Sequence, residues 1–220
     1  MNYYVILFLS LIITMGAQGY LKIKYSTCSK KKCMKGYTGE QVARMILDKN
    51  DLHNVKVESV SGYLSDHYDP KNKVVRLSDY GDSTIASISV AAHECGHAIQ
   101  DKVGYFFLRL RHSIIPIVNL ASYAGYIAIA VGLFAGILNI IWFGIICELV
   151  ILAFQLITLP VEFNASRRGL QQLVDLNIIE KEELSSCRGM LIAAALTYVA
   201  AVASAILEIF RLLAMVSRRD

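Results

Sequence analysis

Four long apolar stretches dominate the pattern of hydrophobic and polar positions along the chain. They run from Tyr3 to Leu21, from Ile114 to Leu138, from Ile140 to Pro160 and from Met190 to Val216. Each is long enough to cross the hydrocarbon core of a bilayer as a helix. The second and third meet around residues 138–139, which predicts a tight hairpin. The pattern predicts a mainly α-helical membrane protein with about four transmembrane helices.

Two polar regions, residues 22–113 and 161–189, separate these stretches. Because four spans with a short middle turn return both regions to the same side of the membrane, one site can draw residues from both. Six lysines follow the first span, at positions 22, 24, 30, 31, 32 and 35, whereas Arg218 and Arg219 lie at the C-terminus. The positive-inside rule places both polar regions in the cytoplasm, although the C-terminal arginines argue the other way.

The first polar region has the elements of a small α+β domain. Thr38 to Gln41 has the form of a capping box, so a helix is predicted there. Residues 55–60 and 73–77 read as strands, and the second is a candidate edge for pairing with an extended substrate. The segment from Gly62 to Asn72 is predicted to be a loop. A polar turn ending near residues 82–83 predicts a further helix, whose apolar stripe is Ile85, Ile88, Ala92, Cys95 and Ile99.

That further helix contains the HExxH sequence His93-Glu94-Cys95-Gly96-His97. Residues four apart lie only about 40° apart around a helix, so both imidazoles can bind one metal ion. Glu94 lies about 100° from His93 and can reach a water molecule on that metal. This is the arrangement of a zinc peptidase. Cys95 points into the packing face, and Gly96, on the side of the histidines, allows another helix to approach closely.

A catalytic zinc site needs a third protein ligand and one open position. Glu162 is the best candidate, because it lies just beyond the third span, on the same side of the membrane as the motif. Pro160 would kink the helix there and could bring Glu162 over the motif helix. Taken alone, Glu162 is better explained as a solvated charge at a helix start, where a negative charge is favourable. An HExxH motif that lacks a third ligand favours the metal-binding interpretation.

Composition and charge agree with a membrane protein. The chain has 220 residues, of which 55% are hydrophobic and 18% charged, whereas soluble domains are nearer a quarter charged. The juxtamembrane lysines account for the net charge of +4 and suit the lipid bilayer, so no nucleic-acid partner is expected. Five cysteines without an evident pairing fit a reducing cytoplasm.

Five segments of the sequence resemble the bacterial membrane-bound neutral zinc metallopeptidases of the YugP type. They are Gly39–Asp48, Asp66–Pro70, Val90–Gln100, Leu159–Arg168 and Ala194–Ala200. The resemblance implies a zinc-dependent endopeptidase with a gluzincin-like site. It also implies that His93, His97 and Glu162 bind one Zn²⁺ ion and that Glu94 is the catalytic base. It implies a reaction type but no substrate.

Further polar residues are candidates for supporting roles. His67 and Tyr68 are the first candidates for the donor that stabilises the oxyanion, and Arg168 is a more distant one. Asn164 is a candidate to hydrogen-bond a metal ligand. For each of these, an ordinary loop, surface or headgroup contact is the alternative. Glu148 and Glu208 fall inside apolar stretches, where carboxylates are expected to face protein or water.

Five segments are therefore expected. They are an N-terminal transmembrane anchor (1–21), a zincin-like domain with the HExxH helix (22–113), a transmembrane hairpin (114–160), a cytoplasmic helical segment with the third ligand (161–189) and a C-terminal transmembrane helix (190–220). We expect a multi-pass protease of the cytoplasmic membrane of a bacterium, with its active site on the cytoplasmic side. Its expected substrates are peptides or membrane proteins. A non-catalytic, zinc-stabilised scaffold is the main alternative, and a transporter is a weaker one because no internal repeat is visible.

Overall fold

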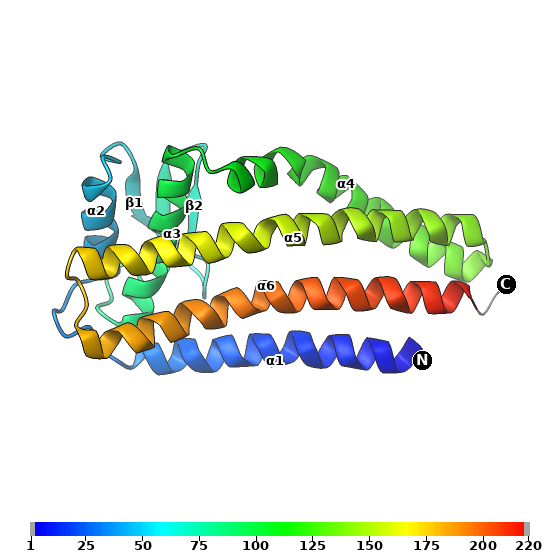
Figure 1. The fold of residues 1–220 in the computed structure, drawn as a ribbon, viewed down its shortest axis with the longest axis horizontal. Coiled ribbons are helices and arrows are strands. Elements are labelled where there is room, and N and C mark those ends of the chain that lie inside the picture. Colours follow the sequence, from blue (N-terminus) through cyan, green and yellow to red (C-terminus); the bar gives the residue numbers. More distant parts are fainter. Residues whose placement is uncertain (1–2, 218–220) are drawn as a thin grey trace. The chain divides into compact units, whose positions relative to one another are not determined.

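The structure, a computed structural model, describes residues 3–217 (Figure 1). The elements in chain order are α1 (Tyr3–Ser29), α2 (Gly39–Lys49), β1 (Lys56–Ser59), β2 (His67–Asp69), β3 (Val74–Leu77), α3 (Ile85–Lys102), α4 (Phe106–Ala135), α5 (Leu138–Asp175) and α6 (Lys181–Val216). They form two compact units. The helical unit comprises the described parts of Met1–Gly19, Arg109–Pro160 and Leu196–Asp220, and the site unit comprises Tyr20–Leu108 and Val161–Ala195.

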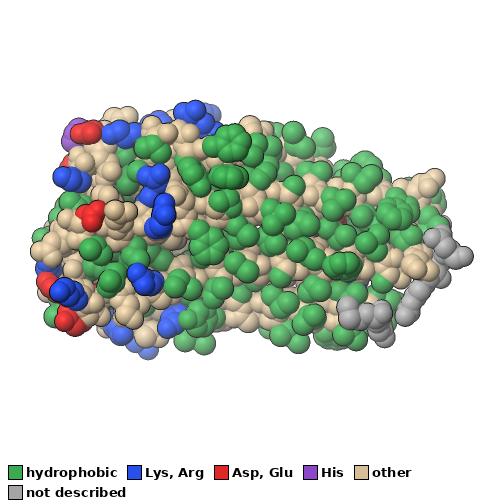
Figure 2. Space-filling model, in the orientation of Figure 1, with side chains coloured by type: hydrophobic (Ala, Val, Ile, Leu, Met, Phe, Trp, Pro, Cys, Tyr) green, Lys and Arg blue, Asp and Glu red, His purple; other side chains and the backbone are tan. Residues whose placement is uncertain are grey.

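The helical unit consists of parts of α1, α4, α5 and α6, each of which is long and apolar enough to cross a membrane. Figure 2 shows that hydrophobic side chains cover the visible surface of these helices. Phe134 and Leu120 are 95% and 71% exposed, as expected for side chains that face lipid. The prediction of a mainly helical fold with four helices long and apolar enough to cross a membrane is therefore confirmed.

The turn between α4 and α5 lies at Gly136 and Ile137, two residues before the predicted position. The physical reason is the backbone of Gly136, whose φ of 71° lies in the left-handed region that glycine adopts readily at a helix end. Within this unit, Glu208 pairs with Arg211, one turn further along α6, and Glu148 is buried.

The site unit contains a three-stranded sheet in the order β1-β3-β2. β1 is parallel to β3, and β2 is antiparallel to it. Two predictions were wrong here. Residues 67–69, expected to lie in a loop, form β2, because the Asp69 carboxylate accepts the Lys71 and Asn72 N–H groups and closes a tight turn into β3. β3, expected to offer a free edge, is the central strand, and the edges of the sheet belong to β1 and β2.

Helices α2 and α3 pack on this sheet and on each other. The capping box at Thr38 and Gln41 is present at the start of α2. The N-cap of α3 is Thr84, just beyond the predicted turn, because its hydroxyl accepts the Ser87 N–H. The predicted apolar stripe of α3 is buried in one core with the inward-facing Val75 and Leu77 of β3. This packing fixes the rotation of α3 and therefore the direction in which its polar face points.

Candidate metal centre

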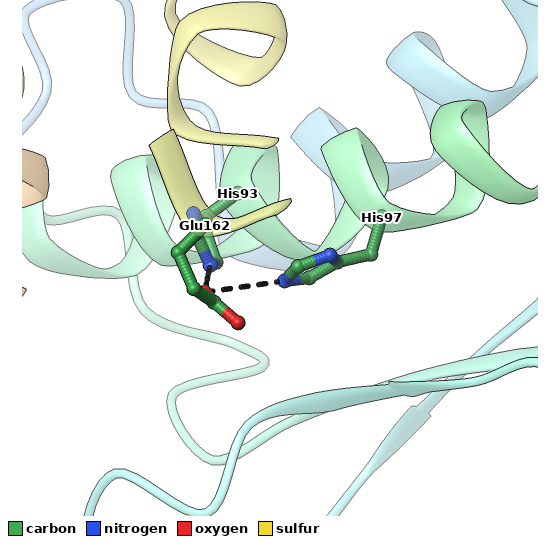
Figure 3. A group of neighbouring side chains, drawn as sticks. All are labelled: His93, His97 and Glu162. Carbon is green, nitrogen blue, oxygen red and sulfur yellow. Dashed lines mark ion pairs between the residues drawn. The ribbon is translucent and has the colours of Figure 1, made fainter. Parts of the chain in front are cut away.

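The polar face of α3 presents the two histidines of the HExxH sequence side by side. The ring centroids of His93 and His97 lie 4.8 Å apart, with the ring planes nearly perpendicular. Nε2 of His93 lies 3.3 Å from Oε2 of Glu162, and Nε2 of His97 lies 3.6 Å from the same oxygen (Figure 3). One ligand atom from each residue lies within 4.8 Å of the other two. The structure thus brings together the three side chains that the sequence selects.

Close packing between α3 and α5 brings Glu162 to the histidines. A Cβ atom added to Gly96 of α3 would lie 2.3 Å from the carbonyl oxygen of Ala165 on α5. A Cβ atom added to Gly169 of α5 would lie 2.4 Å from the carbonyl oxygen of Ala92 on α3. The prediction that Gly96 admits another helix is therefore confirmed. α5 continues through Pro160 as one helix, and the two glycines allow its close approach to α3.

The carboxylate of Glu162 is buried. Its side chain is 3% exposed, while those of His93 and His97 are 15% and 12% exposed. Burial alone raises the pKa of Glu162, but hydrogen bonds to both histidines and their positive charge outweigh it and hold the pKa well below its usual range. A buried, charged carboxylate beside two imidazoles is a donor set that suits Zn²⁺.

A hydrogen-bond chain behind His97 determines which of its ring nitrogens carries a proton. Nε2 of Gln100 lies 2.8 Å from the carbonyl oxygen of Val161, which can only accept, so the NH₂ end of this amide points there. The oxygen end of Gln100 therefore faces Nδ1 of His97, at 3.1 Å, and Nδ1 must donate. When this ring binds a metal as a neutral imidazole, its Nε2 lone pair is therefore the one directed toward Glu162.

This arrangement provides a test of whether a metal fits. A cation would fit between Nε2 of His97 and the Glu162 oxygen, which lie 3.6 Å apart, because the lone pair of a neutral imidazole and the carboxylate oxygen can both bind it. His93 is oriented in the same sense, because its Nδ1 is bonded to the hydroxyl of Ser166 at 3.0 Å and its Nε2 faces Glu162. Engagement of Nδ1 by a neighbour is the usual way in which a protein orients a metal-binding histidine. The residues present therefore fit a zinc ion.

Glu94 lies next to this group and is almost entirely buried. Burial, with the nearby Glu162 carboxylate, raises the pKa of Glu94 to about 7, even though the charge of His93 and the backbone N–H of Tyr68 favour its ionised form. A carboxylate that titrates near neutral pH is suited to accept and return a proton.

The remaining predicted residues lie around the metal-binding group in different roles. Oδ1 of Asn164 accepts from Nε2 of Gln100, whose oxygen faces His97, and from Nε of Arg168. The hydroxyl of Tyr68 donates to Asp101, 2.7 Å away. His67 is exposed and contacts the carbonyl oxygen of Ser65 through Nδ1.

Sequence reasoning missed Gln100 and Ser166, the two residues that orient the histidines. Gln100 lies three residues after His97, on nearly the same face of α3, and it is fully buried. Ser166 lies four residues after Glu162, one helical turn further along α5. A buried amide or hydroxyl one turn from a metal ligand is a signal that could have identified both.

Comparisons with known proteins agree with this geometry. The family described as "Putative neutral zinc metallopeptidase" matches residues 3–217. The chain is 47% identical over 197 residues to the "Putative membrane protease YugP" of Bacillus subtilis (strain 168), which covers 89% of this chain and 88% of the relative. No solved structure matches the chain. The family match extends over almost the whole sequence, and the chain therefore belongs to this family of neutral zinc metallopeptidases.

Proposed function

We propose that the protein is a zinc-dependent membrane endopeptidase whose active site comprises His93, Glu94, His97 and Glu162. The observation that carries the proposal is that Nε2 of His93 and Nε2 of His97 both approach one oxygen of Glu162. The Nδ1 atoms of the two rings are meanwhile bonded to Ser166 and Gln100. Three protein ligands on a tetrahedral ion leave one position open, which distinguishes a catalytic zinc site from a structural one. We assign one ion to the site.

In the proposed reaction the metal ligands and Glu94 have different roles. When bound, Zn²⁺ supplies a Lewis acid that lets a water molecule attack a peptide carbonyl near neutral pH. Glu94 takes a proton from that water and passes it to the departing amine, so its carboxylate begins and ends each cycle ionised. Burial of Glu162 and Glu94 excludes bulk water, which strengthens the interactions of both groups.

The outer edge of β2 is the proposed binding edge for an extended substrate. β3 is paired on both sides, whereas β2 pairs only with β3 within the described sheet. The N–H of Tyr68, in the middle of β2, donates to Glu94, so this strand runs past the catalytic carboxylate. A peptide paired with β2 would therefore lie beside the metal-binding group. Tyr68 and His67, both on β2, and Arg168 remain the proposed oxyanion donors, although in this structure the Tyr68 hydroxyl donates to Asp101 and Nε of Arg168 donates to Asn164.

The cellular setting is also a proposal. The four apolar helices support a multi-pass protein, and the lysines after the first span support a cytoplasmic active site in a zincin-like domain. Glu162 follows the third apolar stretch by two residues, so the site is close to the membrane surface along α5. This position suits substrates that are membrane proteins or peptides held at that surface.

The decisive experiment uses the full-length purified protein and its Glu94→Gln variant. Both proteins should bind one zinc ion, because Glu94 is not a ligand. Only the parent should cleave a reconstituted membrane-protein substrate, since loss of a general base costs about 10²–10⁴ in rate. Internal cleavage of peptides blocked at both ends would identify an endopeptidase. Zinc binding without cleavage by the parent would instead support the scaffold, and equal cleavage by both forms would remove Glu94 from the mechanism.

A further inference from the structure

A pocket in the site unit lies between α5 and α6, and one of its residues contacts the metal-binding group. Its wall includes Ser166, whose hydroxyl is bonded to Nδ1 of His93. The rest of the wall combines two kinds of side chain. Phe163, Leu170, Leu191 and Ile192 are apolar, and Arg167 and Arg188 are cationic. We call this the arginine pocket.

Two large apolar side chains of the arginine pocket are exposed. Phe163 is 48% exposed and Ile192 is 47% exposed, although both belong to the compact site unit. Large apolar side chains that gather in an open pocket are characteristic of a surface that binds something apolar. The occupant therefore needs a hydrocarbon part.

The two arginines give the pocket a strong positive charge. Both are exposed, and within residues 3–217 neither guanidinium has a hydrogen-bond or ion-pair partner in the structure. No acidic side chain in this part of the chain lines the pocket. Guanidinium groups bind phosphate through paired N–H donors, and two of them around one pocket favour an anionic phosphate group. The occupant therefore also needs a negative charge.

The position of the arginines along their helices indicates where this ligand would come from. Arg167 lies seven residues after Pro160, where the third apolar stretch ends, which is about 10 Å along a helix. Arg188 lies two residues before Met190, where the last apolar stretch begins. For a chain whose apolar helices cross the bilayer, both arginines are at the depth of the lipid headgroups.

We propose that the arginine pocket binds one anionic phospholipid. The lipid phosphate is held by Arg167 and Arg188, and the first part of an acyl chain lies against Phe163, Leu170, Leu191 and Ile192. This lipid would cover the Ser166 side of His93, so the pocket connects the composition of the surrounding membrane with a proposed metal ligand. The inference does not depend on protease activity.

Fluorescence quenching by brominated lipids tests this site in the full-length protein. The chain has one tryptophan, Trp142, so Trp142→Phe combined with Phe163→Trp places the only tryptophan in the arginine pocket. The protein is reconstituted into phosphatidylcholine vesicles that contain increasing amounts of brominated phosphatidylglycerol or brominated phosphatidylcholine. Phosphatidylglycerol is expected to quench at much lower content than phosphatidylcholine. Equal quenching by the two lipids would overturn the proposal.

Matched charge variants distinguish the pocket from general attraction to an anionic surface. Arg167→Gln with Arg188→Gln should weaken the response to phosphatidylglycerol by about thirtyfold, since each basic residue contributes a factor of about five. Lys30→Gln with Lys32→Gln removes the same charge from exposed positions outside the pocket and should leave most of the response intact. An equal loss in both pairs would overturn the proposal, as would displacement of the lipid by millimolar inorganic phosphate.

Native mass spectrometry of the protein with its natural Phe163 provides a second readout. The parent should retain one phosphatidylglycerol molecule in neutral detergent, and the double arginine variant should retain none. Retention by both would contradict the assignment. Thermal unfolding of each variant in the same detergent confirms that it is folded.

Discussion

The side-chain oxygen of Gln100 lies 3.1 Å from Nδ1 of His97 and determines which nitrogen of that ring faces Glu162. The orientation of Gln100 is itself fixed by the carbonyl oxygen of Val161, which belongs to the same helix as Glu162. One amide therefore links the helix that provides two proposed ligands to the helix that provides the third.

Replacement of Gln100 by methionine should weaken zinc binding about 10–100-fold, because His97 loses the partner that orients it. Methionine nearly preserves the volume of the buried side chain, so the change tests hydrogen bonding rather than packing. The measurement is competition for zinc with a chelator of known affinity. Gln171→Met, at an exposed position of α5, is the matched control and should bind zinc as the parent does. Unchanged affinity in the Gln100 variant would remove this residue from the site.

Replacement of Ser166 by alanine should also weaken zinc binding, by about tenfold. The loss should be smaller than at Gln100, because Ser166 is partly exposed and water can replace its hydroxyl beside His93. The same competition assay measures the effect. Ser185→Ala, at an exposed position of α6, controls for the substitution itself. A larger loss at Ser166 than at Gln100 would show that the two histidines are not supported as the structure indicates.

Gly96→Ala should separate α3 from α5, because the added Cβ atom would lie 2.3 Å from the carbonyl oxygen of Ala165. Overpacking of this kind costs about 1–3 kcal/mol of folding free energy. Moving Glu162 away from the histidines should also reduce zinc affinity. Thermal unfolding and zinc competition measure the two effects. Gly16→Ala in α1, where nothing lies within 4 Å of an added Cβ, should change neither quantity appreciably. A Gly96 variant as stable as the parent would refute the close packing.

The metal-free protein should lose stability as the pH rises from about 4.3 to about 7. Burial raises the pKa of Glu94 to about 7 in the folded state, whereas an unfolded glutamate titrates near 4.3. The unfolded state therefore releases its proton first, and ionisation of Glu94 opposes folding by about 4 kcal/mol above pH 7. Glu94→Gln carries no charge at this position and escapes this cost.

Unfolding after removal of metal by a chelator, at pH 5 and at pH 8, measures the effect. The Glu94→Gln variant should be clearly more stable than the parent at pH 8 and nearly equal to it at pH 5. A difference between the two proteins that is the same at both pH values would show that Glu94 does not titrate in this range.

Signals within a few residues of one another in the sequence correctly predicted helix starts and helix faces. The capping box at Thr38, the stripe of α3 and the face shared by His93 and His97 all follow from helical periodicity. Glu162 could be selected because a polar site near a span has few available carboxylates. β2 could not be predicted, because three residues ending at Asp69 become a strand only through pairing with β3. The roles of Gln100 and Ser166 depend on how α3 packs on α5, which no local pattern encodes.

The ligand set joins parts of the polypeptide that are far apart in the chain. His97 and Glu162 are separated by 65 positions (162 − 97), and all of α4 lies between them. An ion held by both residues would act as a crosslink that closes this long loop and, like a disulfide, would restrict the unfolded chain more than the folded one. Metal uptake would therefore also complete assembly of the site unit by fastening the part of α5 that carries Glu162 to α3.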